Sequence, residues 1–126
     1  MQNNSCCCET TTTLIFACAG GSNVGQLSNE IGIILTEKGT GKLFCLAGIG
    51  GNVSGIVKST ESADNIIVID GCQLDCAKKT LEEKNLKFTK HIRITELGVT
   101  KNHDLRLDKE LIDETLKKVE EKLNEG

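Results

Sequence analysis

Short apolar runs alternate along the chain with stretches in which apolar residues recur at helical spacing. The runs are rich in Ile, Val, Leu and Phe, and several of them end at glycine, which is typical of buried strands. The pattern predicts four strands, at 12–18, 42–47, 65–70 and 88–94.

The segments between these runs predict helices, because their apolar residues recur every three or four positions. Ser22 and Asp108 are suitable N-caps for the first and last of them. The predicted helices run from Ser22 to about Gly39, over 53–60, over 72–85 with Leu74 facing inward, and from Asp108 to Leu123. The segment 96–105 is expected to be a loop.

Strands that alternate with helices at these spacings form βαβ units. The chain is therefore expected to be an α/β protein, a single three-layer domain with a mostly parallel sheet of about four strands in the order 2-1-3-4 and helices on both faces. Residues 12–126 would form this domain, and residues 1–11 would be a flexible tail that contains Cys6, Cys7 and Cys8.

Composition and charge argue against several classes of function. The 126 residues suit one domain, and the net charge is −3 without a basic stripe. The absence of Trp and Tyr leaves little for bases to stack on, so we expect no nucleic-acid partner. No apolar stretch is long enough to span a membrane, and no export signal is visible, which favours the cytoplasm, where thiols stay reduced.

The seven cysteines are therefore expected to be ligands or reactive groups, and four of them stand where strands end. Cys18 ends the first predicted strand, Cys45 lies near the end of the second, and Cys72 follows the third. Cys76 lies one helical turn after Cys72, on the same predicted helix face. The carboxyl ends of parallel strands share one edge, so the sequence predicts a four-thiolate metal site there, with zinc as the metal.

Other interpretations of the cysteines remain open. Each is also a small apolar residue that suits a core. Cys18 at a helix start could serve thiol redox or sulfur-transfer chemistry, and four thiolates also suit an iron–sulfur cluster. Cys6, Cys7 and Cys8 could supply a ligand, a redox thiol or a second soft-metal site, or have no role.

Several neighbouring polar residues admit two interpretations. Asp70 either accepts a hydrogen bond beside the metal or caps the following helix. Asn23 and Ser22 could orient ligands, or Ser22 could be only an N-cap. His91 and His103 are expected to be ordinary surface residues. No catalytic constellation is evident, since Val24 stands where a cysteine phosphatase needs arginine, so the sequence favours a protein that is not an enzyme.

Four segments together resemble the DGC-domain family. They are Cys18-Ala-Gly-Gly-Ser-Asn-Val-Gly-Gln-Leu-Ser28, Cys45-Leu-Ala-Gly, Ile69-Asp-Gly-Cys-Gln-Leu-Asp-Cys-Ala77 and Ile94-Thr-Glu-Leu-Gly-Val-Thr-Lys101. The family consists of small prokaryotic proteins described as zinc-binding from their cysteine pattern.

The resemblance implies metal binding through Cys18, Cys45, Cys72 and Cys76, without implying a reaction. It also draws attention to Lys101, which either pairs with the anionic site or is a solvated loop residue. The expected function is a small cytoplasmic metal-binding protein, structural or metal-handling, whose protein partner the sequence does not indicate.

Overall fold

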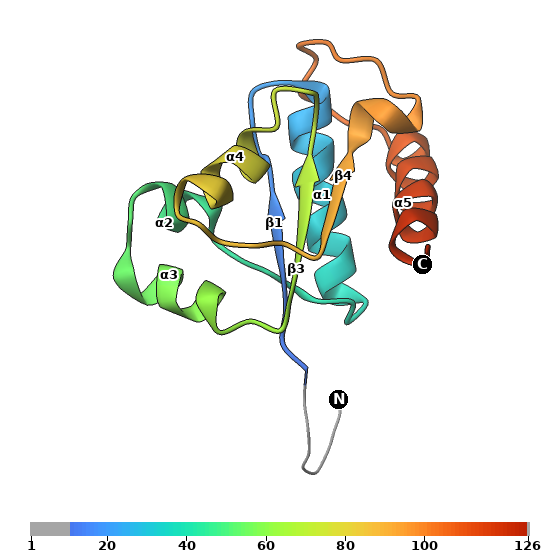
Figure 1. Ribbon diagram of the computed structural model, residues 1–126. Coiled ribbons are helices and arrows are strands. Elements are labelled where there is room, and N and C mark those ends of the chain that lie inside the picture. The colour runs from blue at the N-terminus through green and yellow to red at the C-terminus, as the bar shows by residue number, and fades with distance from the viewer. Residues whose placement is uncertain (1–10, 126) are drawn as a thin grey trace.

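Four parallel strands form the centre of the computed structural model, which describes residues 11–125 (Figure 1). The strands are β1 (Thr13–Ala17), β2 (Lys42–Leu43), β3 (Asn65–Asp70) and β4 (Lys90–Arg93). Their order is β2-β1-β3-β4, and all neighbours are parallel. The predicted α/β fold and strand order are therefore confirmed. The segment 1–10 of the predicted tail lies outside the described residues.

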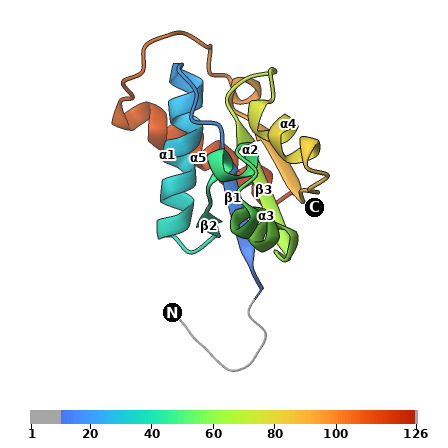
Figure 2. The same ribbon diagram turned by 90° about the vertical axis from the view of Figure 1, so that its left-hand side faces the viewer.

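Helices cover both faces of this sheet (Figure 2). One face carries α1 (Asn23–Glu37), the 3-10 helix η1 (Ile94–Leu97) and α5 (Lys109–Leu123). The other carries α2 (Leu46–Gly50), α3 (Ser54–Glu61) and α4 (Cys76–Glu83). Among the helices of residues 11–125, none has the length and apolar character needed to cross a membrane.

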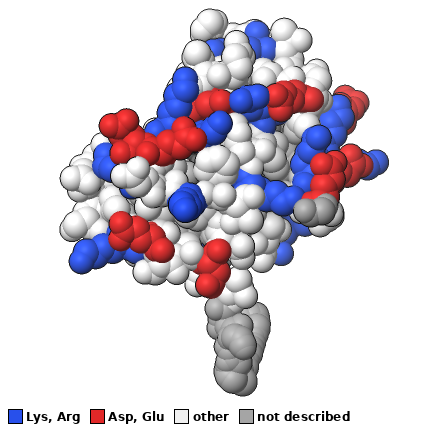
Figure 3. Space-filling model, viewed as in Figure 1, with Lys and Arg blue, Asp and Glu red and all other residues white. Residues whose placement is uncertain are grey.

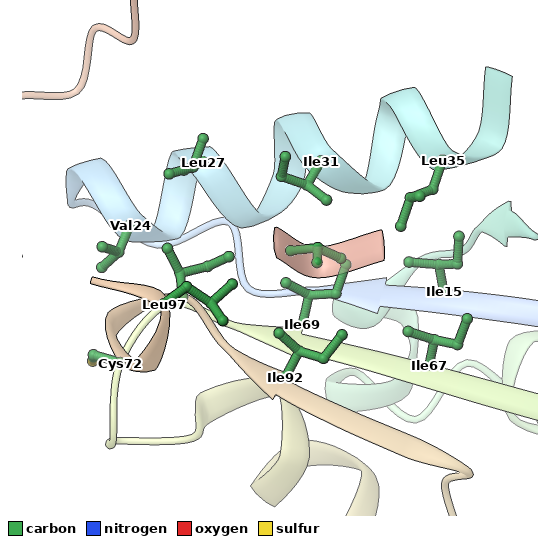
Figure 4. Packing of buried hydrophobic residues seen from close by; sticks show 12 residues of the cluster. Ile15, Val24, Leu27, Ile31, Leu35, Ile67, Ile69, Cys72, Ile92 and Leu97 are labelled. Carbon is green, nitrogen blue, oxygen red and sulfur yellow. The ribbon is translucent and has the colours of Figure 1, made fainter. Parts of the chain in front are cut away.

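The two faces of the sheet hold two separate apolar cores, because side chains alternate along each strand. In β3, Ile67 and Ile69 pack toward α1, while Ile66 and Val68 pack toward α4. Figure 4 shows the first of these cores, with the side chains of α1 lying over the strands. This two-sided burial explains why β3 reads as a continuous apolar run in the sequence.

The centre of the sheet also fixes where its carboxyl edge lies. β1 pairs with β3 in register from Thr13 opposite Asn65 to Ala17 opposite Ile69. The ladder continues for one more bond, because the Cys18 amide donates to the carbonyl of Ile69 at 2.9 Å. Cys18 and the residues that follow β3 are therefore held at the same edge.

Two of the predicted boundaries were wrong. The apolar run 42–47 forms a strand only at Lys42–Leu43, after which Leu46–Gly50 turns into the short helix α2. The helix expected from residue 72 begins at Cys76, because residues 71–75 form a turn that ends with Asp75 in the left-handed region at φ 55°. Leu74, expected to face inward, lies on this turn and is 54% exposed.

Close backbone packing at the carboxyl edge generates a first prediction. A Cβ atom on Gly71 would lie 2.8 Å from the carbonyl carbon of Val24 and 2.9 Å from the amide nitrogen of Gly25. We expect Gly71→Ala to lower the free energy of unfolding by about 2 kcal/mol, because α1 must move away from the turn. Urea unfolding followed by far-ultraviolet circular dichroism measures this change.

Gly21→Ala is the matched control, because a Cβ atom at Gly21 would meet nothing within 4 Å. Equal stability of the two variants would contradict the packing argument.

Candidate thiol site at the carboxyl edge of the sheet

Cys18 lies directly after β1, and its half-buried side chain packs with the core on the α4 side of the sheet. Burial is the largest influence on this thiol and raises its pKa above the ordinary value. Hydrogen bonds from the backbone of Gly20 and Gly71 oppose the increase, while the neighbouring charges of Asp70 and Cys76 add to it.

Asp70 connects the end of β3 to the start of α4. Its carboxylate is only 1% exposed, and it accepts hydrogen bonds from the amide of Ala77 at 2.7 Å and that of Lys78 at 3.1 Å. These amides belong to the first turn of the helix, which lacks intrahelical partners for them. The capping role that the sequence offered for Asp70 is confirmed, and the cap fixes Cys76, the exposed first residue of α4, beside the strand ends.

A buried ion-pair network extends from Asp70. His91 Nε2 lies 2.9 Å from Asp70 Oδ2 and 3.6 Å from Asp75 Oδ1. Arg93 donates to both carboxylate oxygens of Asp75, at 2.7 and 2.8 Å, and thereby holds the pKa of Asp75 below its ordinary value. The expectation of an ordinary surface role for His91 was wrong, since its side chain is only 14% exposed and contacts both carboxylates.

The potential ligand atoms of this network lie as close together as those of a metal site, but their carboxylate oxygens already accept hydrogen bonds. Within residues 11–125, Asp70, Asp75 and His91 are the one set of three potential ligand residues whose atoms lie within 4.8 Å of one another. Both oxygens of Asp70 already accept amide bonds, and both oxygens of Asp75 already accept bonds from Arg93. The guanidinium supplies the cation here, so we interpret the cluster as structural.

Cys72 packs on the opposite face of the sheet from Cys18. Its buried side chain belongs to the core on the α1 side of the sheet, together with Val24 and Leu97 (Figure 4). Lys101 Nζ lies 3.5 Å from its sulfur. The predicted placement of Cys72 and Cys76 on one helix face was wrong, because Cys72 lies in the turn of residues 71–75 and only Cys76 is helical.

Cys45 lies two residues beyond the end of β2, and it is the exposed residue from which α2 begins. The preceding residue, Phe44, still bonds to β1 through its amide, which donates to the carbonyl of Ile15 at 2.8 Å. Since α2 packs against α4, the chain after Cys45 continues along the face that carries Cys76.

Asn23, the first residue of α1, binds the segment of residues 100–102. Its amide nitrogen Nδ2 donates to the carbonyl of Thr100 at 2.9 Å, and its Oδ1 accepts from the amide of Asn102 at 2.7 Å. Its backbone amide donates to the carbonyl of Asn102 at 3.0 Å. Ser22, the N-cap, accepts from the amide of Gly25 at 3.1 Å. Asn23 therefore orients the segment that carries Lys101, not a cysteine directly.

Four thiols are a donor set that zinc prefers in structural sites. A zinc ion bound by four sulfurs at about 2.3 Å brings the sulfurs to within roughly 3.8 Å of one another. No three of Cys18, Cys45, Cys72 and Cys76 have sulfurs within 4.8 Å of one another, so the side chains do not stand at ligating distances. The side chains of Cys45 and Cys76 are exposed. Cys6, Cys7 and Cys8 lie outside the described residues.

The family model of the DGC domain matches residues 14–119, a span that contains all four of these cysteines and Lys101. The chain belongs to the DGC-domain family. A relative from Pseudomonas aeruginosa, named anaerobic and virulence modulator AnvM, is 35% identical over 89 residues, which cover 71% of this chain and 68% of the relative. No solved structure gives a significant match.

The surface adds no separate charged site on the side that Figure 3 presents. Lys and Arg side chains there lie interspersed with Asp and Glu side chains. Individual surface pairs, such as Lys38 with Glu120 and Lys109 with Asp113, contribute to this mixture. The carboxyl edge therefore remains the best candidate for a functional site.

The cap on α4 generates a second prediction. Asp70→Ala leaves the amides of Ala77 and Lys78 without their acceptors, so we expect the free energy of unfolding to fall by about 2 kcal/mol. Asp70→Asn keeps one carbonyl oxygen as an acceptor and should lose less. Urea unfolding of both variants at neutral pH tests the difference, and equal losses would show that the helix amides do not depend on this residue.

The Asp75–Arg93 pair generates a third prediction, on acid stability. Because Arg93 lowers the pKa of Asp75 in the folded state, the pair stabilises the fold at neutral pH, and this contribution disappears as the pH falls through the lowered pKa. Arg93→Met should therefore reduce the urea midpoint at pH 7, and the gap to the unmodified protein should narrow toward pH 3.

Arg106→Met is the matched control, since Arg106 lies exposed outside the network. A gap for Arg93→Met that stays constant with pH, or the same behaviour in Arg106→Met, would contradict the assignment.

Proposed function

We propose that the protein binds zinc through Cys18, Cys45, Cys72 and Cys76. The observation that carries the proposal is the delivery of four free thiols to one edge of the sheet by the ends of three adjacent strands, β2, β1 and β3. Ligand sites of open α/β sheets lie at this edge. Thiolate sulfur is a preferred ligand of zinc, and four thiolates make a closed tetrahedral site.

The surroundings of Cys18 support its role as the central ligand. Its strand is flanked by β2, which precedes Cys45, and by β3, which precedes Cys72. The backbone of Gly20 and Gly71 lowers the pKa of Cys18 against the effect of burial, and backbone groups of this kind stabilise a thiolate at a metal. Binding would require the exposed side chains of Cys45 and Cys76 to turn toward it, and Cys72 to approach from the other face.

A closed four-thiolate site leaves no position for an activated water, so the role we propose is metal handling or structural, not hydrolysis. The two apolar cores lie between the sheet and its helices, with Phe16 and Ile69 fully buried on opposite faces. Removal of the metal should therefore alter the carboxyl edge and leave the domain folded, which favours metal handling. The name of the relative AnvM, a modulator, also describes no reaction.

A second candidate is thiol redox chemistry, with Cys18 and Cys76 as the pair of thiols. One thiol of the pair is half-buried and the other is exposed at the start of α4. In a redox protein, the exposed thiol reacts first with a disulfide and the second resolves the mixed product. This candidate predicts one rapidly alkylated thiol in the native protein, whereas a metal site protects its thiols together until the ion is removed.

The zinc proposal generates a fourth prediction. Protein purified without oxygen should contain about one zinc ion per chain, and single Cys→Ser changes at positions 18, 45, 72 and 76 should each lower that content strongly. Elemental analysis measures the metal. The absence of Trp and Tyr leaves the near-ultraviolet open for thiolate–metal bands.

The matched control replaces Cys6, Cys7 and Cys8 together with serine, which should leave the zinc content unchanged. Iron with visible colour would instead indicate a cluster protein. A metal-free protein with one fast-reacting thiol would overturn the zinc proposal in favour of redox chemistry.

A further inference from the structure

We propose that Lys101 is a positioning residue that compensates the charge of the thiol site through Cys72, and that Asn23 holds it in place. This inference rests on the proposed metal-binding function. Lys101 would contribute positive charge to the affinity for zinc, and Asn23 would hold the segment that carries it. Both effects are separable from those of the four cysteines.

The first observation is the contact itself. Lys101 Nζ lies 3.5 Å from the sulfur of Cys72, within hydrogen-bonding distance for a sulfur acceptor. Lys101 belongs to an exposed segment, whereas Cys72 is buried. An ammonium group interacts more strongly with a metal-bound thiolate than with a neutral thiol, so this contact would be strengthened in a loaded site.

The second observation is that the segment is anchored, so the contact does not depend on the lysine side chain alone. The chain rises from η1, passes over the start of α1 and descends to α5 (Figures 1 and 2). Asn23 holds residues 100–102 through three hydrogen bonds, two that it donates and one that it accepts, and Asn23 is itself buried. The amide of Asp104 donates to Asn102 Oδ1 at 2.8 Å and fixes the next turn.

The third observation concerns the other basic groups near this edge. Arg93 is fully engaged by Asp75 and Glu96. His91 lies between Asp70 and Asp75. Among the hydrogen bonds of the described residues, the one from a basic side chain to a cysteine sulfur is that of Lys101. Arg93 and His91 are thus committed to carboxylates, whereas Lys101 directs its ammonium group to a cysteine sulfur.

The charge of a four-thiolate zinc complex makes such a cation useful. Four thiolates around Zn²⁺ leave an excess of two negative charges, which a nearby ammonium group offsets. A hydrogen bond to the sulfur of Cys72 would also keep that ligand oriented, as groups around metal ligands commonly do. Lys101 therefore supports the affinity of the site without supplying a ligand.

The test is zinc affinity, measured by competition with a chromophoric chelator at fixed pH and ionic strength. Lys101→Met should bind zinc roughly tenfold more weakly, because a partly exposed charge close to the site is removed. Lys101→Arg should restore most of the loss. Lys58→Met is the matched control, since it removes the same charge from α3 and should bind like the unmodified protein.

The role of Asn23 is tested by measuring the zinc affinity of Asn23→Ala alone and together with Lys101→Met. Asn23→Ala should also weaken binding, and it should add little in a Lys101→Met background, because its effect passes through the lysine. Circular dichroism checks that each variant is folded. If Asn23→Ala fails to fold, the comparison of Lys101→Met, Lys101→Arg and Lys58→Met still decides the proposal.

Equal affinities of Lys101→Met and Lys58→Met would overturn the role of Lys101 while leaving the metal site intact. Failure of the unmodified protein to bind zinc would overturn the proposed function itself, and this inference with it. A loss that Lys101→Arg does not restore would also overturn charge compensation, because the positive charge is retained in that variant.

Discussion

The carboxylate of Asp70 is the interaction on which the arrangement of the carboxyl edge depends. It stands at the end of the central strand β3, caps α4 and bonds to His91 of the neighbouring strand β4. Three elements thus meet at one buried group. Because such a group is costly to leave without partners, the capped geometry is strongly preferred over any alternative start of α4. The position of Cys76 follows from that preference.

The edge combines this polar bonding with unusually close backbone contacts. Gly71 approaches the first turn of α1, and Gly25 in that turn approaches Gly20. Side chains at these positions would separate the two loops that carry Cys18 and Cys72. The glycines and the carboxylate therefore act together. The glycines allow the two loops to pack closely, and the carboxylate of Asp70 fixes the start of α4.

The sequence predicted the fold well, because its strongest signals were local and repeated. The apolar run of β3, the spacing of α5 and the N-caps Ser22 and Asp108 all matched the elements observed. The start of α4 was missed, since the left-handed Asp75 has no clear sequence signature and Cys72 and Leu74 continue a helical pattern. His91 was missed because its partners lie far away in the chain, and only the pairing of β3 with β4 brings them together.

Because Cys18 and Cys72 pack on different faces of the sheet, folding would have to precede the binding of an ion by all four cysteines. Cys18 and Cys72 are far apart in the chain and pack in different cores, so in an unfolded chain their encounter would carry a large loop-closure cost. The sheet removes that cost by aligning β1 with β3. An ion held by all four cysteines would therefore bind to an already folded domain. It would cross-link the two layers of the domain after folding.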